Sequence, residues 1–218
     1  MKKKITVLIA LLLICSVILF FVFHEKNNKE LETAVNNTIN FIEDNDYKIS
    51  VDLNSVYTYE GISFKSKISY IERKNEDKYE FSYKLYESDK LVNENTSYAL
   101  KKEDNYTYYY KDNDEYKSKD VNDISSENEF NINIKPFFKK IDNFKKRNGN
   151  YIIKMNKKDV YGLIYNKEFN DLSGKVDVTL NLKDDFIRTI SFDASMSKEE
   201  KCKVKIIIDF STQEIKLP

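Results

Sequence analysis

The sequence has little of what most catalytic sites need. It contains one histidine, His24, and only four glycines among its 218 residues. A single histidine excludes histidine-based catalytic triads, HExxH metal sites and most zinc chemistry. The glycines form neither a G-x-S-x-G nucleophile turn nor a phosphate-cradling loop, so P-loop nucleotide binding is excluded as well. We therefore expect a protein that is not an enzyme and that holds no cofactor.

Cysteine is equally scarce. Only Cys15 and Cys202 are present, and Cys15 falls in an apolar N-terminal segment. The rest of the chain therefore cannot form an internal disulfide, and its stability must come from a hydrophobic core. Cys202 is a free thiol, a disulfide partner for another chain or, most simply, an ordinary strand residue.

Neither sign of charge is in excess, because 36 basic residues balance 36 acidic ones. This balance gives no reason to expect a nucleic-acid partner. Acidic clusters occur at Asp112–Glu115 and Asp184–Asp185, but neither is followed by the glycine and distant glutamate of a calcium loop. Both clusters fall at expected turns, where acidic residues are common, so no metal site is predicted.

The strongest local signal is an apolar run at the N-terminus. Three lysines precede the uncharged segment Ile5–Phe23, which as a helix spans about 28 Å and is long enough to cross a bilayer. The lysines place the N-terminus in the cytoplasm. We predict a cytoplasmic tail of residues 1–4, a single-pass anchor or uncleaved signal of residues 5–23 in the cell membrane, and an extracytoplasmic domain of residues 24–218.

Two alternatives for this segment stay open. A cleaved signal peptide needs small residues near its cleavage site, and Val22-Phe23-His24 has none. A lipoprotein signal would use Cys15 as the lipidated residue, since Leu12-Leu13-Ile14-Cys15 resembles a lipobox. Ile14 stands where a small residue is expected, however, and the apolar run continues past the cysteine.

The extracytoplasmic part reads as one α+β domain. Apolar residues at a spacing near 3.6 predict a juxtamembrane helix over residues 24–46, and its apolar stripe favours packing against the domain over a free stalk. From Tyr47 the apolar period changes to two, which predicts a meander of about nine half-buried antiparallel strands. The expected strands include residues 47–53, 62–70, 79–85, 91–101, 106–111, 151–155, 176–182, 190–196, 204–210 and 215–217. Residues 113–128 are predicted to be mostly loop.

Two helices are expected in the middle of this meander. Lys135-Pro136 opens a helix that ends before Asn148-Gly149, with an apolar stripe on one face. Asn156 can cap a second, shorter helix that carries Val160 and Leu163.

This order of elements resembles the LolA and LppX-like lipoproteins over the extracytoplasmic domain. The resemblance rests on the strand Tyr151–Met155 leading into the helix Lys157–Asn166, then Val176–Ile190, then the closing stretch Asp209–Pro218. It implies a strongly curved, half-barrel antiparallel sheet covered by a few helices, with an apolar cavity that holds lipid acyl chains in that family. The sequence departs from the family in lacking a good lipobox and in its richness in tyrosine.

If such a cavity exists, the apolar and aromatic residues of the alternating strands line it. The candidates are Phe64, Tyr70, Phe81, Tyr83, Tyr98, Tyr108, Val178 and Leu180. Tyrosine suits the wall of a pocket for an amphiphilic ligand, because it offers an apolar ring and a hydroxyl. The alternative is that these residues fill an ordinary core between sheet and helices.

The expected helix Pro136–Arg147 is basic as well as amphipathic. Such a helix is either the lid of the cavity, able to touch anionic lipid, or an ordinary covering helix with its lysines in solvent. The residues concerned are Phe137, Phe138, Ile141, Phe144, Lys139 and Lys140.

Two functions follow from these observations. The first is a non-catalytic, membrane-tethered protein that binds a lipid or another amphiphile between sheet and helices. The second is a module at the cell surface that interacts with a protein partner, as a sensor or assembly component, and has a packed core without a ligand. An apolar cavity beneath the helices distinguishes the two.

Overall fold

The computed structural model describes residues 25–127, 134–138, 141, 144–163, 172–195 and 199–218. The predicted anchor lies outside these ranges, as do Cys15, Lys139 and Lys140. Among the described residues, no helix combines the length and the apolar character that crossing a bilayer requires. The anchor and the membrane topology therefore stay predictions.

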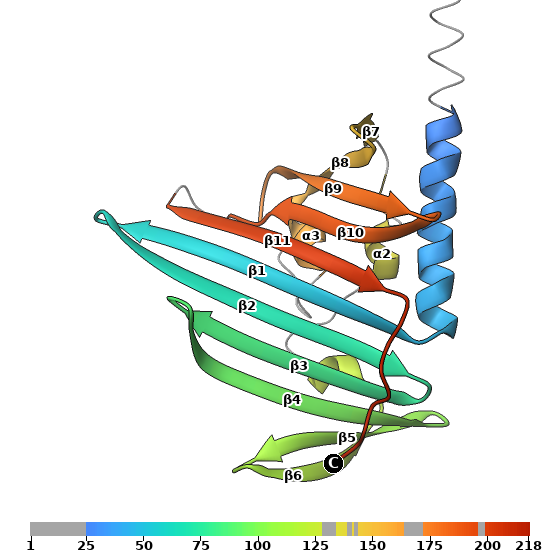
Figure 1. Cartoon of the computed structure of the whole chain (residues 1–218), viewed down its shortest axis with the longest axis vertical. Helices are drawn as coiled ribbons and strands as arrows, with labels where there is room; N and C mark the ends of the chain where they lie inside the picture. Colours follow the sequence, from blue (N-terminus) through green and yellow to red (C-terminus); the bar gives the residue numbers. More distant parts are fainter. Residues whose placement is uncertain (1–24, 128–133, 139–140, 142–143, 164–171, 196–198) are drawn as a thin grey trace, which may run out of the picture.

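One antiparallel sheet of 11 strands, open and curved, dominates the structure (Figure 1). Its strands are β1 (Tyr47–Tyr59), β2 (Ile62–Asn75), β3 (Lys78–Glu87), β4 (Lys90–Lys102), β5 (Asn105–Asp112), β6 (Glu115–Val121), β7 (Phe144–Arg147), β8 (Asn150–Asn156), β9 (Lys175–Lys183), β10 (Phe186–Asp193) and β11 (Glu200–Asp209). Strands adjacent in the chain pair from β1 to β6 and from β7 to β11, and β1 pairs with β11. The predicted curved antiparallel sheet is confirmed.

The two faces of the sheet differ in burial. Alternate residues of β1, namely Ile49, Val51 and Leu53, are at most 5% exposed. They form one hydrophobic core with alternate residues of the other strands and with side chains of three helices. We call the face that bears this core the inner face and the opposite face the outer face. Figure 1 views the outer face, with α2 (Ile134–Phe138) and α3 (Lys157–Tyr161) behind the strands.

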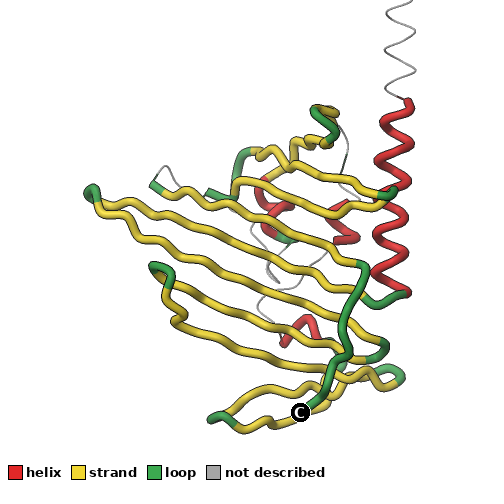
Figure 2. Tube along the Cα trace, in the orientation of Figure 1, coloured by secondary structure: helices red, strands yellow, loops and turns green. Residues whose placement is uncertain are grey.

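A helix of residues 25–44 runs along one end of the sheet (Figure 2). Three of its side chains are buried: Leu31, Ala34 and Thr38. Lys146 of β7 pairs with Glu30 at an N–O distance of 2.6 Å, and Lys74 of β2 donates a hydrogen bond to the Glu43 carbonyl oxygen at 3.1 Å. The helix therefore contacts strands from both halves of the sheet. The prediction that it packs against the domain is confirmed.

Tight turns connect most of the strands. The turn pairs Ser88-Asp89, Asn113-Asp114 and Asp184-Asp185 all have positive φ at both residues. Two consecutive positive φ values define the type I′ turn, whose twist matches that of the flanking antiparallel strands. The turn predicted at residues 183–185 is confirmed.

The predicted loop over residues 113–128 is wrong in part, because Glu115–Val121 forms the edge strand β6. Nearly every residue of β6 is exposed. An edge strand with little buried surface shows no apolar alternation, so the sequence pattern misses it.

The predicted helix Pro136–Arg147 is also wrong in its extent. The helix α2 ends at Phe138, and Phe144–Arg147 forms β7, which pairs with β8. Asn148-Gly149, read from the sequence as the end of a helix, has positive φ at both residues (50° and 77°) and is a hairpin turn. The shorter helix α3 follows Asn156 as predicted, although the Asn156 side chain makes no capping hydrogen bond.

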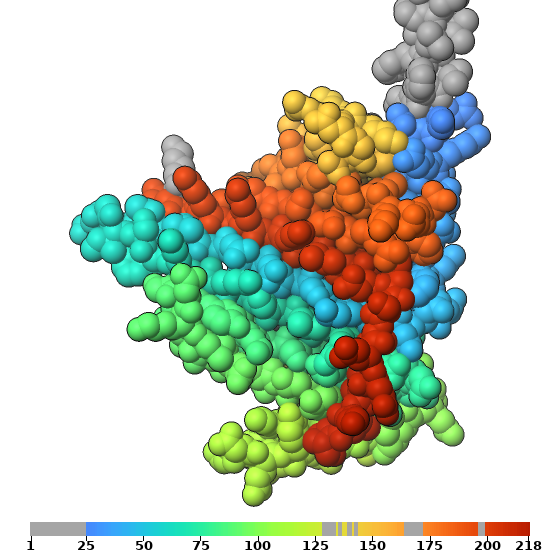
Figure 3. Space-filling model, in the orientation of Figure 1, coloured from blue at the N-terminus to red at the C-terminus, as the bar shows by residue number. Residues whose placement is uncertain are grey.

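The C-terminal segment, residues 211–218, leaves the sheet and crosses its outer face (Figure 3). The strand predicted at residues 215–217 is therefore wrong, because this segment joins no ladder. Ile215 is 1% exposed and lies outside the core cluster of the inner face. One buried side chain thus secures the segment against the outer face.

Thr38 offers a direct test of how the N-terminal helix docks. Its hydroxyl donates to the Ala34 carbonyl oxygen at 2.7 Å and accepts from the buried Ile187 N–H at 2.9 Å. Thr38→Val keeps the shape but leaves the Ile187 N–H unsatisfied, so we expect a loss of about 1–3 kcal/mol in the free energy of unfolding. Urea unfolding of the full chain in detergent measures this loss. Thr38→Ser, which keeps the hydroxyl, is the matched control, and equal losses in both variants would contradict the assignment.

Candidate functional site

The inner face of β2 to β5 carries the aromatic side chains that the sequence singled out. Tyr70 on β2 lies opposite Val51 of β1 on one side and Tyr83 of β3 on the other, so all three share the inner face. Tyr108 of β5 lies opposite the buried Ala99 of β4. Several further rings pack against this core: Tyr79, Tyr106 and Tyr110. Half of the sheet therefore presents a continuous aromatic inner surface.

Six of the eight predicted lining residues meet on the inner face: Tyr70, Phe81, Tyr83, Tyr108, Val178 and Leu180. Val178 and Leu180 belong to β9, in the other half of the sheet, and both are fully buried. Phe64 shares the inner face by register, but it is 57% exposed near the end of the β1–β2 hairpin.

Tyr98 was assigned to the wrong face. It lies opposite Glu80 of β3 and Tyr109 of β5, and its ring meets that of Tyr116 at a centroid distance of 5.8 Å. Its neighbours Ser97 and Ala99 are the buried residues of β4. In β4 the small residues point inward and the aromatic one outward, so aromatic content alone selects the wrong phase of the alternation.

A buried carboxyl group, which was not predicted from the sequence, lies within the aromatic surface. Glu72 of β2 shares the inner phase with Tyr70, and it accepts a hydrogen bond from the Tyr47 hydroxyl at an O–O distance of 2.6 Å. Burial raises the pKa of Glu72 above its ordinary value, although hydrogen bonds from Tyr47 and Tyr70 act in the opposite direction. Burial likewise raises the pKa of Tyr79 to about 12, with smaller contributions from neighbouring groups including Glu72.

The signal for Glu72 was present in the sequence. A charged residue that falls in the buried phase of an alternating strand is unusual, because burying a carboxylate without compensation is costly. Here the tyrosine hydroxyls supply the compensation. The arrangement offers a carboxyl group, able to accept a hydrogen bond and, when protonated, to donate one, beside an aromatic wall.

Short helices lie on the inner side of the sheet, with α2 behind β10 and β11 in Figure 1. Ile134, Phe137 and Phe138 of α2 are at most 5% exposed, and they belong to the same core as the strand aromatics. At the other end, the 3-10 helix η1 (Ile124–Glu127) covers β5 and β6. The Tyr108 hydroxyl donates to the Glu127 carbonyl oxygen at 3.5 Å there, and Lys119 pairs with the Glu127 carboxylate at 2.6 Å.

The predicted lid residues do not all lie on one helix. Phe137 and Phe138 lie in α2 on the inner face, and Ile141 packs against the core. Phe144 belongs to β7, where its ring meets that of Tyr151 at 5.1 Å. The basic amphipathic lid expected from the sequence is therefore a short apolar helix followed by a strand.

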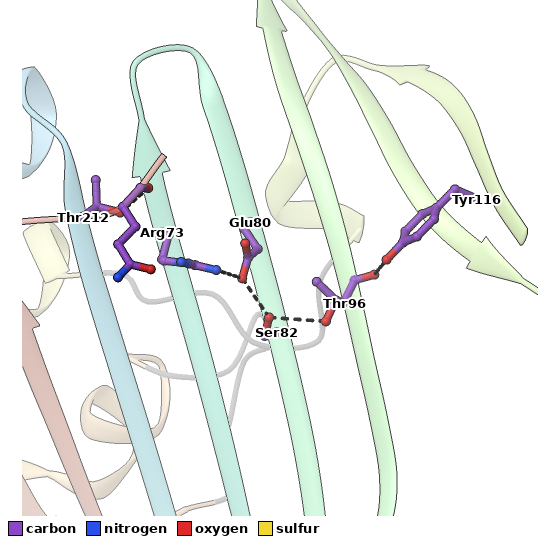
Figure 4. A network of polar contacts seen from close by, with 7 residues as sticks. Arg73, Glu80, Ser82, Thr96, Tyr116 and Thr212 are labelled. Carbon is purple, nitrogen blue, oxygen red and sulfur yellow. Dashed lines mark hydrogen bonds and ion pairs between the residues drawn. The ribbon is translucent and has the colours of Figure 1, made fainter. Parts of the chain in front are cut away.

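The outer face of the same strands is polar (Figure 4). Arg73 forms an ion pair with Glu80, which also accepts a hydrogen bond from the Ser82 hydroxyl at 3.1 Å. Further along, the Tyr116 hydroxyl donates to the Thr96 carbonyl oxygen at 3.4 Å. Figure 4 also shows Thr212, which belongs to the C-terminal segment that crosses this face. A polar network that a chain segment crosses is less suited to an amphiphile than the aromatic inner face, so the candidate site is the inner face.

Cys202 of β11 is buried and free of any disulfide, and burial raises the pKa of its thiol, which makes it unreactive. In the part of the chain that the structure describes, no group of three or more His, Cys, Asp or Glu side chains is placed to hold a metal ion.

Comparison with solved structures finds a similar structure. The structure is similar to that of a β-barrel-like protein with a domain of unknown function (DUF1849) from Brucella abortus, with 10% sequence identity and a TM-score of 0.35. The match covers 75% of this chain and 97% of that one. No protein-family model and no curated protein matches the sequence.

The buried carboxyl of Glu72 predicts a pH dependence of stability. Because its folded pKa is raised, the folded state holds the proton more tightly than the unfolded chain, whose ordinary value is 4.5. The stabilising contribution is thus fully present below about pH 4.5 and is lost as the pH rises through the folded pKa. Glu72→Gln removes this titration and keeps a carbonyl oxygen for the Tyr47 hydroxyl.

We therefore expect the free energy of unfolding of Glu72→Gln to increase relative to that of the natural protein as the pH rises from about 4 to about 8. Urea unfolding at both pH values measures it. Glu87→Gln, at an exposed position, is the control. A difference between Glu72→Gln and the natural protein that does not change with pH would disprove the burial argument.

Proposed function

We propose that this protein is a non-catalytic, membrane-tethered extracytoplasmic protein that binds a lipid or another amphiphile between the inner face of the sheet and its covering helices. The observation that supports it most is the aromatic inner face of β2 to β5, which includes the buried Glu72. An amphiphile has an apolar part that suits the rings and a polar part that suits one hydrogen-bonding group.

The covering elements on this face are short. The helix α2 has five residues and contributes three buried side chains to the inner face. A helix of this length has little stability of its own and is held by packing. Figure 1 shows α2 behind β10 and β11, so its displacement would open the inner side of the sheet there without disturbing the strand pairing, and we propose α2 as the gate for the ligand.

The family relationship and the location belong to the same proposal. A curved sheet with helices on its inner face is the architecture that the resemblance to LolA and LppX-like lipoproteins implied. The apolar run Ile5–Phe23 would tether the domain outside the cytoplasm.

One observation favours a second candidate, a surface interaction module with a packed core. The side chains of Tyr70, Phe81 and Tyr108 are only 3% to 6% exposed, which is typical of a packed core. In this alternative the aromatics are ordinary core residues, and a protein partner at the cell surface replaces the lipid.

Photo-crosslinking separates the two candidates in the full chain. The protein is produced in bacterial membranes loaded with a phospholipid that carries a diazirine in its acyl chain, irradiated and digested, and the labelled peptides are identified by mass spectrometry. We expect label on inner-face residues of β3 and β5, such as Tyr83 and Tyr110, and none on the outer-face residue Tyr109, because Tyr83 and Tyr110 pack against the core of the inner face and Tyr109 does not.

A matched pair of variants makes the result specific. Tyr83→Ala removes an inner-face ring and should reduce the labelling of β5 several-fold, whereas Tyr109→Ala on the outer face should leave it unchanged. Label confined to residues 5–23, with none on β3 or β5, would overturn the lipid-binding proposal and favour the interaction module.

A further inference from the structure

The hairpin between β1 and β2 projects beyond its neighbours. β2 pairs with β3 only from Ser66 onward, and β1 pairs with β11 only as far as Tyr57. The last backbone hydrogen bonds to these neighbours run from the Thr58 N–H to the Glu199 carbonyl oxygen and from the Ser88 N–H to the Lys65 carbonyl oxygen. Residues 59–64 therefore extend past the sheet as a two-stranded ribbon, and we call residues 57–65 the tip, which is the cyan end at the left of Figures 1 and 3. An isolated two-stranded ribbon is only marginally stable in water, so a contact with a partner would stabilise this tip.

One side of the tip is apolar and exposed. Tyr57 lies opposite Phe64, and Tyr59 lies opposite Ile62, so the four side chains share the inner side of the ribbon. Their exposed fractions are 45%, 57%, 57% and 61% in that order. Single exposed apolar residues are ordinary, but four in contact positions on a projecting ribbon form a patch of the kind that marks an interaction site.

The opposite side of the same region is basic. By register and exposure, five lysines lie on the outer side of this end of the sheet: Lys65, Lys67, Lys201, Lys203 and Lys205. Two carboxylates share that side, Asp52 and Asp193, which gives 5 − 2 = +3. Two more, Glu60 and Glu199, lie at the strand ends. Lys65 and Lys201 flank the uncharged Val56 across the strands and face outward at the base of the tip.

We propose that this tip, residues 57–65, docks onto the surface of a bilayer that carries anionic phospholipids. The apolar side would enter the interface between headgroups and acyl chains, where tyrosine rings are favoured. The lysines at the base of the tip would then meet the headgroup phosphates. A bilayer surface matches both sides of the ribbon at once, whereas an apolar protein groove matches only one. This inference is independent of whether the inner face binds a lipid.

The composition of the chain supplies a clean reporter, because it contains no tryptophan. Tyr59→Trp places a single tryptophan at the tip, and Tyr116→Trp places one on the edge strand β6, outside the tip. We call these variants the tip reporter and the edge reporter. Each full chain is reconstituted into vesicles of equimolar phosphatidylglycerol and phosphatidylcholine with brominated acyl chains, which quench nearby indole fluorescence. The two variants are otherwise identical, so a difference between them reflects the position of the tip and not the tethering of the protein.

We expect the tip reporter to be quenched several-fold more strongly than the edge reporter and to emit at a shorter wavelength. In pure brominated phosphatidylcholine, or with Lys65→Glu and Lys201→Glu added, this excess should fall sharply, because the headgroup attraction is lost. Ile62→Ser with Phe64→Ser should abolish it. These positions are exposed, so the thermal midpoint should stay unchanged and shows that each variant is folded.

Equal quenching of the two reporters would overturn the proposal, and an apolar protein surface would then be the better occupant of the tip. Excess quenching that is the same with and without phosphatidylglycerol would overturn its anionic part. Neither result bears on labelling of the inner face of β3 and β5, so failure here is distinguishable from failure of the proposed function.

Discussion

The pairing of β1 with β11 is the constraint on which the rest of the structure depends. It joins the first and last strands in register from Lys48–Asp209 to Tyr57–Glu200 and unites two meanders into one sheet. Its inner side brings Ile49, Val51 and Leu53 beside Ile208, Ile206 and Val204, all at most 5% exposed. Hairpins can form locally, but this contact requires the whole chain between them to be closed, at a large cost in loop entropy. We expect the two meanders to form before it.

Local hairpins were predictable from the sequence, and the long-range pairing was not. Apolar alternation located β1, β2, β3 and β9 to β11 because each has one buried face. The same signal fails at the edges of the sheet, where β6 and β7 bury little. Asn148-Gly149 shows a second limit: the dipeptide fits both a helix end and a type I′ turn, and only the pairing of β7 with β8 decides between them.

The residue types of the candidate site were predictable from the sequence, but the face of each strand that they occupy was not. Six lining candidates meet on the inner face because they share the alternation of strands with buried cores. Tyr98 fails because β4 turns its small residues Ser97 and Ala99 inward, which depends on the bulky rings of adjacent strands. Glu72 was not predicted because it is charged, although it falls at a buried position of the alternating strand. A rule that weighs phase before residue type would have found both.

The inner row of β2 connects the two proposals physically. From Glu72 it runs through Tyr70, Ile68 and Ser66 to Phe64 and Ile62. Glu72 and Tyr70 are 9% and 3% exposed, whereas Phe64 and Ile62 are 57% and 61% exposed. An amphiphile that left a bilayer at the tip would thus meet apolar side chains at nearly every step of about 7 Å toward the buried carboxyl. Ser66 is the exception, lying where the tip joins the covered sheet. If both proposals hold, transfer along this row should be slowest at that point, because beyond it the covering elements must move aside.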